Sequence, residues 1–271
     1  SLPRQKPLLP GLDNKKGAVI MKNLLSSDWY KLRRLKSFWV CLIINMGLAL
    51  ANVSLIQFSN GGALDGMGAL DYFPRCFSTS TPLFACISVS IFAAGEFGYG
   101  TMKNIASHGF RRDAIFFSKT LVGWLISLVY IVGYFLFTFF PALIFWGVGT
   151  ASETFVTDAL LIASLQILLT LAFSTLFTAV AFLLRQSGGA MAISICIMQF
   201  SLLGASLLQL FLQEVLHIEN QLPHYWISSC MNALYDPLTQ EVIQRCLLVG
   251  FGFLIVFLLC GLLPFRKRDI K

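Results

Sequence analysis

The ionisable side chains that could do chemistry gather in one stretch, residues 95–120, which reads GEFGYGTMKNIASHGFRRDAIFFSKT. Glu96 stands at the end of an apolar segment, where an ionised group is expensive to place in lipid and is therefore a functional candidate. In the structural alternative, it pairs with one of the basic residues that follow, Lys103, Arg111 or Arg112. This stretch is the first candidate for a functional site.

The residue patterns of several enzyme classes are missing from the chain. No Gly-x-x-x-x-Gly-Lys-Ser/Thr phosphate loop occurs, and no glycine is followed directly by lysine. The three histidines, His108, His217 and His224, fall in predicted loops, and neither His-Glu-x-x-His nor Gly-x-Ser-x-Gly is present. We predict no catalytic group and no metal site, and we do not expect the chain to be an enzyme.

The composition indicates a membrane protein. Of 271 residues, 56% are hydrophobic and 12% are charged, whereas soluble domains carry about 25% charged residues. A spanning helix needs about 20 mostly apolar residues, and we therefore expect an all-α membrane protein with six transmembrane helices. The second span is short and contains Pro82 near its start, so a buried amphipathic segment is its alternative. The apolar cores are predicted at 38–58, 81–95, 121–148, 160–184, 190–212 and 247–263.

The distribution of charge predicts how the spans are oriented. Basic residues mark cytoplasmic loops, and with both termini in the cytoplasm, 18 of the 20 lysines and arginines lie on that side. The outer loops then hold eight of the 13 acidic residues. An odd number of spans would place the basic residues of 266–271 outside. Because the positive charge is dispersed over loop ends beside apolar spans, it predicts contact with anionic lipid and no nucleic-acid binding.

The segment before the first span is amphipathic. We predict an interfacial helix over 21–36, MKNLLSSDWYKLRRLK, with Trp29 at head-group depth. An ordinary charged flank of the first span is the alternative. Residues 1–20 are expected to be an N-terminal tail or a cloning remnant outside the fold. At helical spacing the large apolar side chains of the segment fall within one arc: Leu24, Leu25, Trp29, Leu32 and Leu35.

A short polar helix is predicted at 101–108, between the second and third spans. Gly98, Gly100 and Gly109 bracket it, and Thr101 can cap its first turn. A short ordered segment on the cytoplasmic side suits docking to a cytosolic partner. Together with the interfacial helix and the six spans, the pattern E-F-x-Y-G-T-x-K-N-x-x-S-x-G-x-x-R resembles permease subunits of type-2 ABC exporters. By this resemblance, 101–108 would be the coupling helix, which inserts into the ATPase subunit.

The resemblance implies partners and a set of coupling residues. Two cytosolic ABC ATPase subunits would bind ATP and Mg²⁺, and this chain would hold no cofactor. A second copy, or a related permease, would complete the transporter in the plasma membrane, where many small bacterial members resemble bacitracin or lantibiotic-immunity exporters. The permease domain is expected to cover 37–271. The residues assigned to ATPase coupling are Glu96, Tyr99, Gly100, Thr101, Lys103, Asn104, Ser107, His108, Gly109, Arg111, Arg112 and Lys119.

A substrate path is expected, by the same resemblance, between the second and fifth spans of two facing permeases. An apolar, Phe-rich path favours an amphipathic or hydrophobic substrate, such as an antimicrobial peptide, a lipid or a drug. The outer loop 213–245 would form short re-entrant or capping helices; a solvated loop is its alternative. Cys76 and Cys230 fall on outer segments and are a candidate pair. The polar residues available for the path are Ser88, Ser90, Ser194, Gln199, Ser201 and Gln209.

Two other functions compete with an exporter permease. An ion-coupled transporter or a channel, the runner-up, usually needs ionisable groups near the membrane midplane, and the six predicted cores contain no Asp, Glu, Lys or Arg. An intramembrane enzyme would need a constellation such as a paired His and Glu on the spans. The sequence therefore favours a permease powered by a separate ATPase.

Overall fold

The computed structural model describes residues 24–59, 68–77, 80–98, 100, 112–149, 155–216, 222–236 and 238–267. Within these ranges the chain is helical with no strand, which confirms the predicted all-α class. Residues 24–34 form the first described helix. The elements that follow are α2 (Lys36–Ser59), η1 (Phe73–Cys76), α3 (Thr81–Gly98), α5 (Arg112–Trp146), α6 (Phe155–Leu184), α7 (Ser187–Leu216), η2 (Leu222–Tyr225), α8 (Ile227–Ala233) and α9 (Gln240–Lys267).

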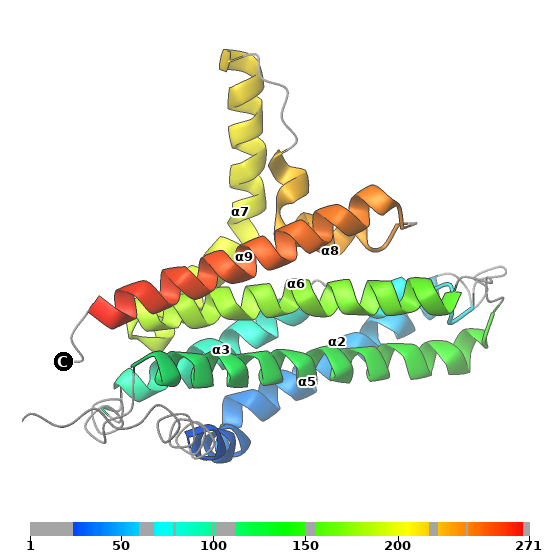
Figure 1. Cartoon of the computed structure of the whole chain (residues 1–271). Helices are drawn as coiled ribbons and strands as arrows, with labels where there is room; N and C mark the ends of the chain where they lie inside the picture. Colours follow the sequence, from blue (N-terminus) through cyan, green and yellow to red (C-terminus); the bar gives the residue numbers. More distant parts are fainter. Residues whose placement is uncertain are drawn as a thin grey trace, which may run out of the picture.

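The described helices are long and apolar enough for a multi-pass membrane protein. Five of them, α2, α3 with the preceding η1, α5, α6 and α9, each suffice to cross a bilayer. A sixth span is present if the two arms of α7, Ser187–Ser201 and Leu203–Glu214, are counted together. These arms are bent by 42° relative to each other, and the outer arm stands away from the other helices (Figure 1).

Helix α6 lies at the centre of the bundle, where it packs against α3, α5, α7 and α9. Every residue from Ala172 to Phe182 is buried, as expected of a helix that is apolar on all sides. Three of its threonine hydroxyl groups, on Thr170, Thr175 and Thr178, bond within the helix; Thr178 Oγ1, for example, donates to the Ser174 carbonyl at 3.0 Å. Such bonds satisfy polar side chains where no water is available.

Small residues allow α9 to approach α6 closely. A Cβ atom at Gly250 would lie 2.8 Å from the Leu168 side chain, and one at Gly261 would lie 3.0 Å from the Ala179 Cα. Backbones in membranes pack best where the residues between them are small. The glycines of α9 therefore set how near α9 lies to the central helix.

The starts of α2 and α5 and the ends of α3, α6 and α9 meet at one end of the bundle, here called the inner end. The helix 24–34 lies at this end. It is seen nearly along its axis in Figure 1, whereas the long helices run across the view, so it crosses their ends. Leu24 and Leu32 on this helix are buried. The predicted position of this helix in the membrane interface stays a prediction.

At the opposite, outer end, the segment 68–77 docks on the loop that follows α5. The Ala69 amide donates to the Gly147 carbonyl at 3.0 Å, and Tyr72 Oη donates to Asn52 Oδ1 at 2.8 Å. Gly149 has a φ of +80° and touches Gly68, where a side chain would have no space. Two short helices, η2 and α8, lie within the predicted outer loop 213–245, whose two ends belong to α7 and α9.

Candidate functional site

The ammonium group of Lys119 is buried between two carboxylates at the inner end. Lys119 Nζ lies 2.7 Å from Asp28 Oδ1 and 2.7 Å from Glu96 Oε1. Its side chain is 0% exposed, and the ring centroid of Phe92 lies 4.4 Å from Nζ. A buried lysine is tolerated when it is paired and its donors are satisfied, and here two carboxylates and an aromatic ring surround it.

The two carboxylates have further donors. Ser118 Oγ donates to Asp28 Oδ2 at 2.7 Å, and the partly exposed Lys31 Nζ donates to Glu96 Oε1 at 2.7 Å. With two acids and two lysines, the charges balance. We call Asp28, Lys31, Glu96 and Lys119 the inner ion network. It joins the helix 24–34, the end of α3 and the start of α5.

Local sequence explains why these groups point inward. Asp28 is four residues from both Leu24 and Leu32, and all three lie on one buried stripe of the helix 24–34. Glu96 similarly continues the buried stripe of α3 that contains Phe92 and Ala93. The helical spacing that buries the apolar side chains thus buries the charged ones beside them.

Asp28 is the functional candidate that sequence reasoning missed. It stands inside the arc formed by the apolar side chains of 21–36, the position where an acid is least expected in an amphipathic helix. Such a residue signals a buried cation, and that signal was available in the sequence. The sequence did not indicate which cation Asp28 binds, since Lys119 lies 91 residues further along the chain.

Of the predicted coupling residues, the structure brings Glu96 and Lys119 together. Among the described residues Glu96 pairs with Lys119 and Lys31; Lys103 and Arg111, which the structural alternative considered, lie outside the described residues. Arg112 Nη1 donates instead to the carbonyl of Arg266 at 2.9 Å. The predicted helix 101–108 lies outside the described residues, as do Tyr99, Thr101, Lys103, Asn104, Ser107, His108, Gly109 and Arg111.

Gly100 is described, and its backbone has a φ of +69°. This left-handed conformation favours glycine, because other residues are strained there. The Gly100 amide donates to the Phe97 carbonyl at 3.3 Å. Gly100 therefore follows the end of α3 in a conformation that suits glycine, directly before the segment predicted to dock on a partner.

A second contact fixes the start of α5. Arg266 near the end of α9 binds Asp113 through two parallel hydrogen bonds, Nε to Oδ1 at 2.5 Å and Nη2 to Oδ2 at 2.6 Å. Bidentate pairs of this kind have a defined geometry. The segment 99–111 is thus bordered by two anchored helix ends, with Glu96 holding α3 on one side and Asp113 and Lys119 holding α5 on the other.

Four phenylalanines pack beneath this junction. The Phe182 ring lies edge-on to Phe97, Phe116 and Phe265, at centroid distances of 5.4, 5.1 and 4.8 Å. Another aromatic cluster at the outer end contains Phe73, Phe77 and Phe135. These phenylalanines hold the chain's own helices together, so their number says nothing of the substrate.

The polar residues proposed for a substrate path lie in different surroundings. Ser88 Oγ is 2.6 Å from Tyr130 Oη, which itself donates to the Phe38 carbonyl, so Ser88 faces the interior between α2, α3 and α5. Ser90 and Ser194 are buried beside the Cys86 thiol. The other three are on α7: Gln199 is exposed, and Ser201 and Gln209 are half-buried. Their role in transport stays a prediction.

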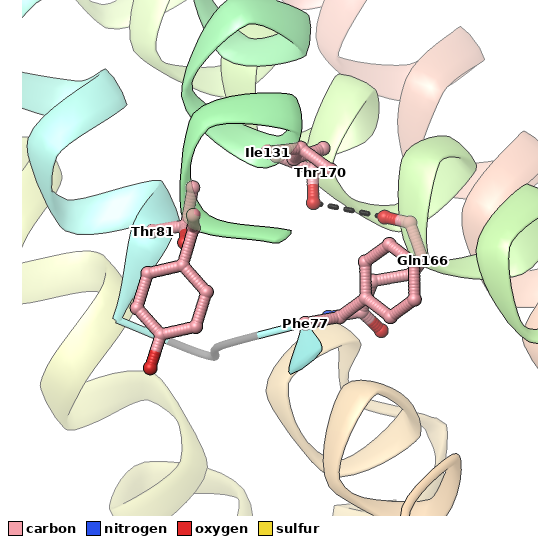
Figure 2. A pocket seen from close by; sticks show the side chains of 6 residues that line it. Phe77, Thr81, Ile131, Gln166 and Thr170 are labelled. Carbon is pink, nitrogen blue, oxygen red and sulfur yellow. Dashed lines mark hydrogen bonds between the residues drawn. The ribbon is translucent and has the colours of Figure 1, made fainter. Parts of the chain in front are cut away.

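A narrow pocket lies between η1, α3, α5 and α6 (Figure 2). Gln166 and Thr81 line it, and within the described part of the chain Gln166 Nε2 and Thr81 Oγ1 have no hydrogen-bond partner. Thr170 Oγ1 donates to the Gln166 carbonyl at 2.8 Å. The pocket is too narrow to hold a water molecule, and we assign it to packing.

The cysteines and the possible metal ligands form no site among the described residues. No group of three or more His, Cys, Asp or Glu side chains could hold a metal ion there. Cys76 and Cys230, the candidate pair, are both free and buried. Cys230 lies instead next to Cys246, whose Sγ is 3.7 Å from the Cys230 carbonyl.

Comparison with known proteins identifies the family. A search of curated proteins found no match. A family model described as "ABC-2 family transporter protein" matches residues 24–204, a range that begins at the helix 24–34 and contains the whole inner ion network. More than half of the sequence is matched, and the chain therefore belongs to the ABC-2 family of transporter proteins.

Proposed function

We propose that this chain is the permease subunit of an ATP-driven exporter. ABC-2 family members are the membrane components of transporters and associate with ABC ATPases, which in this proposal bind ATP and Mg²⁺. One observation carries the proposal: Lys119 is buried between Asp28 and Glu96. This lysine links the helix 24–34 to α3 and α5, the two helices that precede and follow, in the sequence, the segment expected to dock on the ATPase.

In the proposed mechanism the inner ion network transmits force. A push on 101–108 by closing ATPase subunits reaches α3 through Gly100 and α5 through Arg112. Separating Lys119 from Asp28 would leave a buried carboxylate without its cation, which costs several kcal/mol, and separating it from Glu96 would break the buried 2.7 Å ion pair between α5 and α3. The ends of α3 and α5 therefore move together, and they take the helix 24–34 with them.

The proposed transporter contains two permeases that face each other, either two copies of this chain or this chain with a relative. The outer arm of α7 supports an apolar pathway, because Leu203, Leu207 and Phe211 on it are more than half exposed. Its charged residue is Glu214, at the far end. We propose export of an amphipathic or hydrophobic substrate, such as an antimicrobial peptide, a lipid or a drug, across the plasma membrane of a bacterium.

Affinity purification of the chain from its native membranes tests the partner. We expect a cytosolic protein of ATPase size in a fixed ratio to the chain. The protein should be lost when the order of residues 101–108 is scrambled and retained when the order of residues 217–221, in the predicted outer loop, is scrambled. A chain that purifies alone, or only with itself, would remove the basis of the proposal.

The energy source needs its own experiment. In ATP-loaded proteoliposomes that contain the complete transporter, a proton uncoupler should leave transport unchanged, and removal of ATP should stop it. Transport that collapses with the uncoupler and continues without ATP would favour an ion-coupled transporter.

A further inference from the structure

An apolar groove runs between the interfacial helix and α5 at the inner end. Leu25, Ser26 and Trp29 of the helix 24–34 form one wall, and Val122 and Leu125 of α5 form the other. The space measures about 280 Å³. A dry cavity of about 150 Å³ already holds a benzene molecule, so this groove has room for several carbons of a hydrocarbon chain and none for a folded peptide.

The depth of the groove in the membrane follows from two tryptophans. Trp29 is 44% exposed and Trp39 is 48% exposed, and Trp39 Nε1 donates to the Arg33 carbonyl at 3.0 Å. Tryptophans that are only half exposed are typical of the boundary between head groups and acyl chains. The groove therefore lies where a lipid has its phosphate at one end and its first methylenes at the other.

The exposed charge of the same helix is entirely positive. Lys31, Arg33 and Arg34 are all exposed, as is Lys36 at the start of α2, whereas Asp28, the single acid between residues 24 and 36, is buried and bound to Lys119. The inner ion network thus hides the negative charge of this helix from its surface. The exposed basic side chains attract an anionic head group.

One of these basic residues is in register with the groove. Arg33 follows Trp29 by four residues and Ser26 by seven, so it lies on the groove side of the helix. Arg34 lies on another side, where its guanidinium stacks 4.4 Å from the centroid of the Tyr30 ring. Arg33 and Arg34 therefore allow a positive charge on the groove side of the helix to be compared with one on another side.

We propose that this groove binds one anionic phospholipid, with part of an acyl chain between the helix 24–34 and α5 and with its phosphate on Arg33. The hydrocarbon would cover Trp29 and Leu125, and the head group would be held by a charge-assisted hydrogen bond. A zwitterionic lipid has the same phosphate, but its own cation competes with Arg33. The bound lipid would support the helix next to Asp28.

Native mass spectrometry of the full chain in detergent tests the proposal. The probes are palmitoyl-oleoyl phosphatidylglycerol and the matching phosphatidylcholine. We expect one phosphatidylglycerol to be retained in preference to phosphatidylcholine, and Arg33→Gln to weaken its retention about tenfold, as the loss of a charge-assisted bond predicts. Arg34→Gln removes the same charge beside Arg33 and should leave retention within about twofold of the unmodified chain.

The groove itself needs a separate variant. Ser26→Trp places a large ring over the groove from an exposed position, so the fold should tolerate it, and it should also weaken retention about tenfold. Equal losses for Arg33→Gln and Arg34→Gln would show diffuse attraction and overturn the proposal. Full retention in Ser26→Trp, or equal retention of both lipids, would overturn it as well.

A measurement in vesicles completes the test. Phosphatidylcholine vesicles with a minor fraction of phosphatidylglycerol are prepared with bromine on the acyl chains of one lipid or the other, at equal mole fractions. The signal of Trp29, taken as the difference from Trp29→Phe, should be quenched more by the brominated phosphatidylglycerol. Equal quenching would contradict a selective site. Neither experiment uses ATP or an ATPase, so a negative result leaves the proposed permease function untouched.

Discussion

The ammonium of Lys119 and the carboxylate of Glu96, 2.7 Å apart, join the start of α5 to the end of α3 across the intervening segment 99–111. Asp28 on the helix 24–34 binds the same ammonium. Three elements that are separate in the sequence therefore share one buried cation. Four predictions follow from this junction and from the helix packing around it.

Removal of the shared cation should destabilise the protein, and removal of Asp28 with it should restore part of the loss. Lys119→Met leaves Asp28 buried without its counter-charge, which costs about 3–5 kcal/mol. In Asp28→Asn/Lys119→Met the network is again neutral, because Glu96 keeps Lys31. The thermal unfolding of the purified variants, followed by tryptophan fluorescence, should show the double variant above Lys119→Met. Strictly additive losses would contradict a shared network.

Glu96→Gln should uncouple ATP hydrolysis from transport while the protein stays folded, because Lys119 retains Asp28. Substrate-stimulated ATPase activity of the reconstituted transporter is the measurement, and insertion into the membrane is checked in parallel. Lys31→Gln is the matched control: Lys31 contacts the same Glu96 oxygen, but its side chain is 41% exposed, and exposed pairs contribute at most about 1 kcal/mol. Normal coupling in Glu96→Gln would argue against transmission through this residue.

Gly100→Ala should weaken binding of the ATPase partner. The left-handed conformation at Gly100 costs a residue with a side chain about 1–2 kcal/mol, so the direction in which the chain leaves α3 would change. Gly98→Ala is a close control, because a Cβ at either position meets nothing within 4 Å and Gly98 is helical. Co-purification of the partner should fall for Gly100→Ala only. Equal partner yields from both variants would count against the proposed turn.

Gly261→Ala should loosen the packing of α9. Its Cβ would lie 2.6 Å from the Phe116 ring, within the inner aromatic cluster, and overpacking of this kind costs about 1–3 kcal/mol. Gly252→Ala on the same helix meets nothing within 4 Å and should leave the thermal midpoint unchanged or slightly higher. If the new Cβ clashes with the Phe116 ring, Phe116→Leu should restore the thermal midpoint of Gly261→Ala. A Gly261→Ala variant as stable as Gly252→Ala would refute the clash.

Hydropathy and charge by themselves determined the class of this protein. In lipid the backbone must satisfy its own hydrogen bonds, so an apolar run of sufficient length becomes a helix whatever its neighbours are. The run 81–95, for example, lies within α3, although Pro82 made it the least certain span. Glu96 could be singled out in the same way, since an ionisable residue at the end of such a run has few alternatives to a buried partner.

Tertiary structure alone decided which groups meet. Asp28 could be recognised from the sequence as misplaced within an apolar arc, yet its contact with Lys119 depends on how the helix 24–34 packs against α5. The bend between the arms of α7 and the contact of Gly68 with Gly149 are likewise absent from any local pattern. Hydropathy acts on each segment separately, whereas a shared cation or a close backbone contact exists only once several helices have packed.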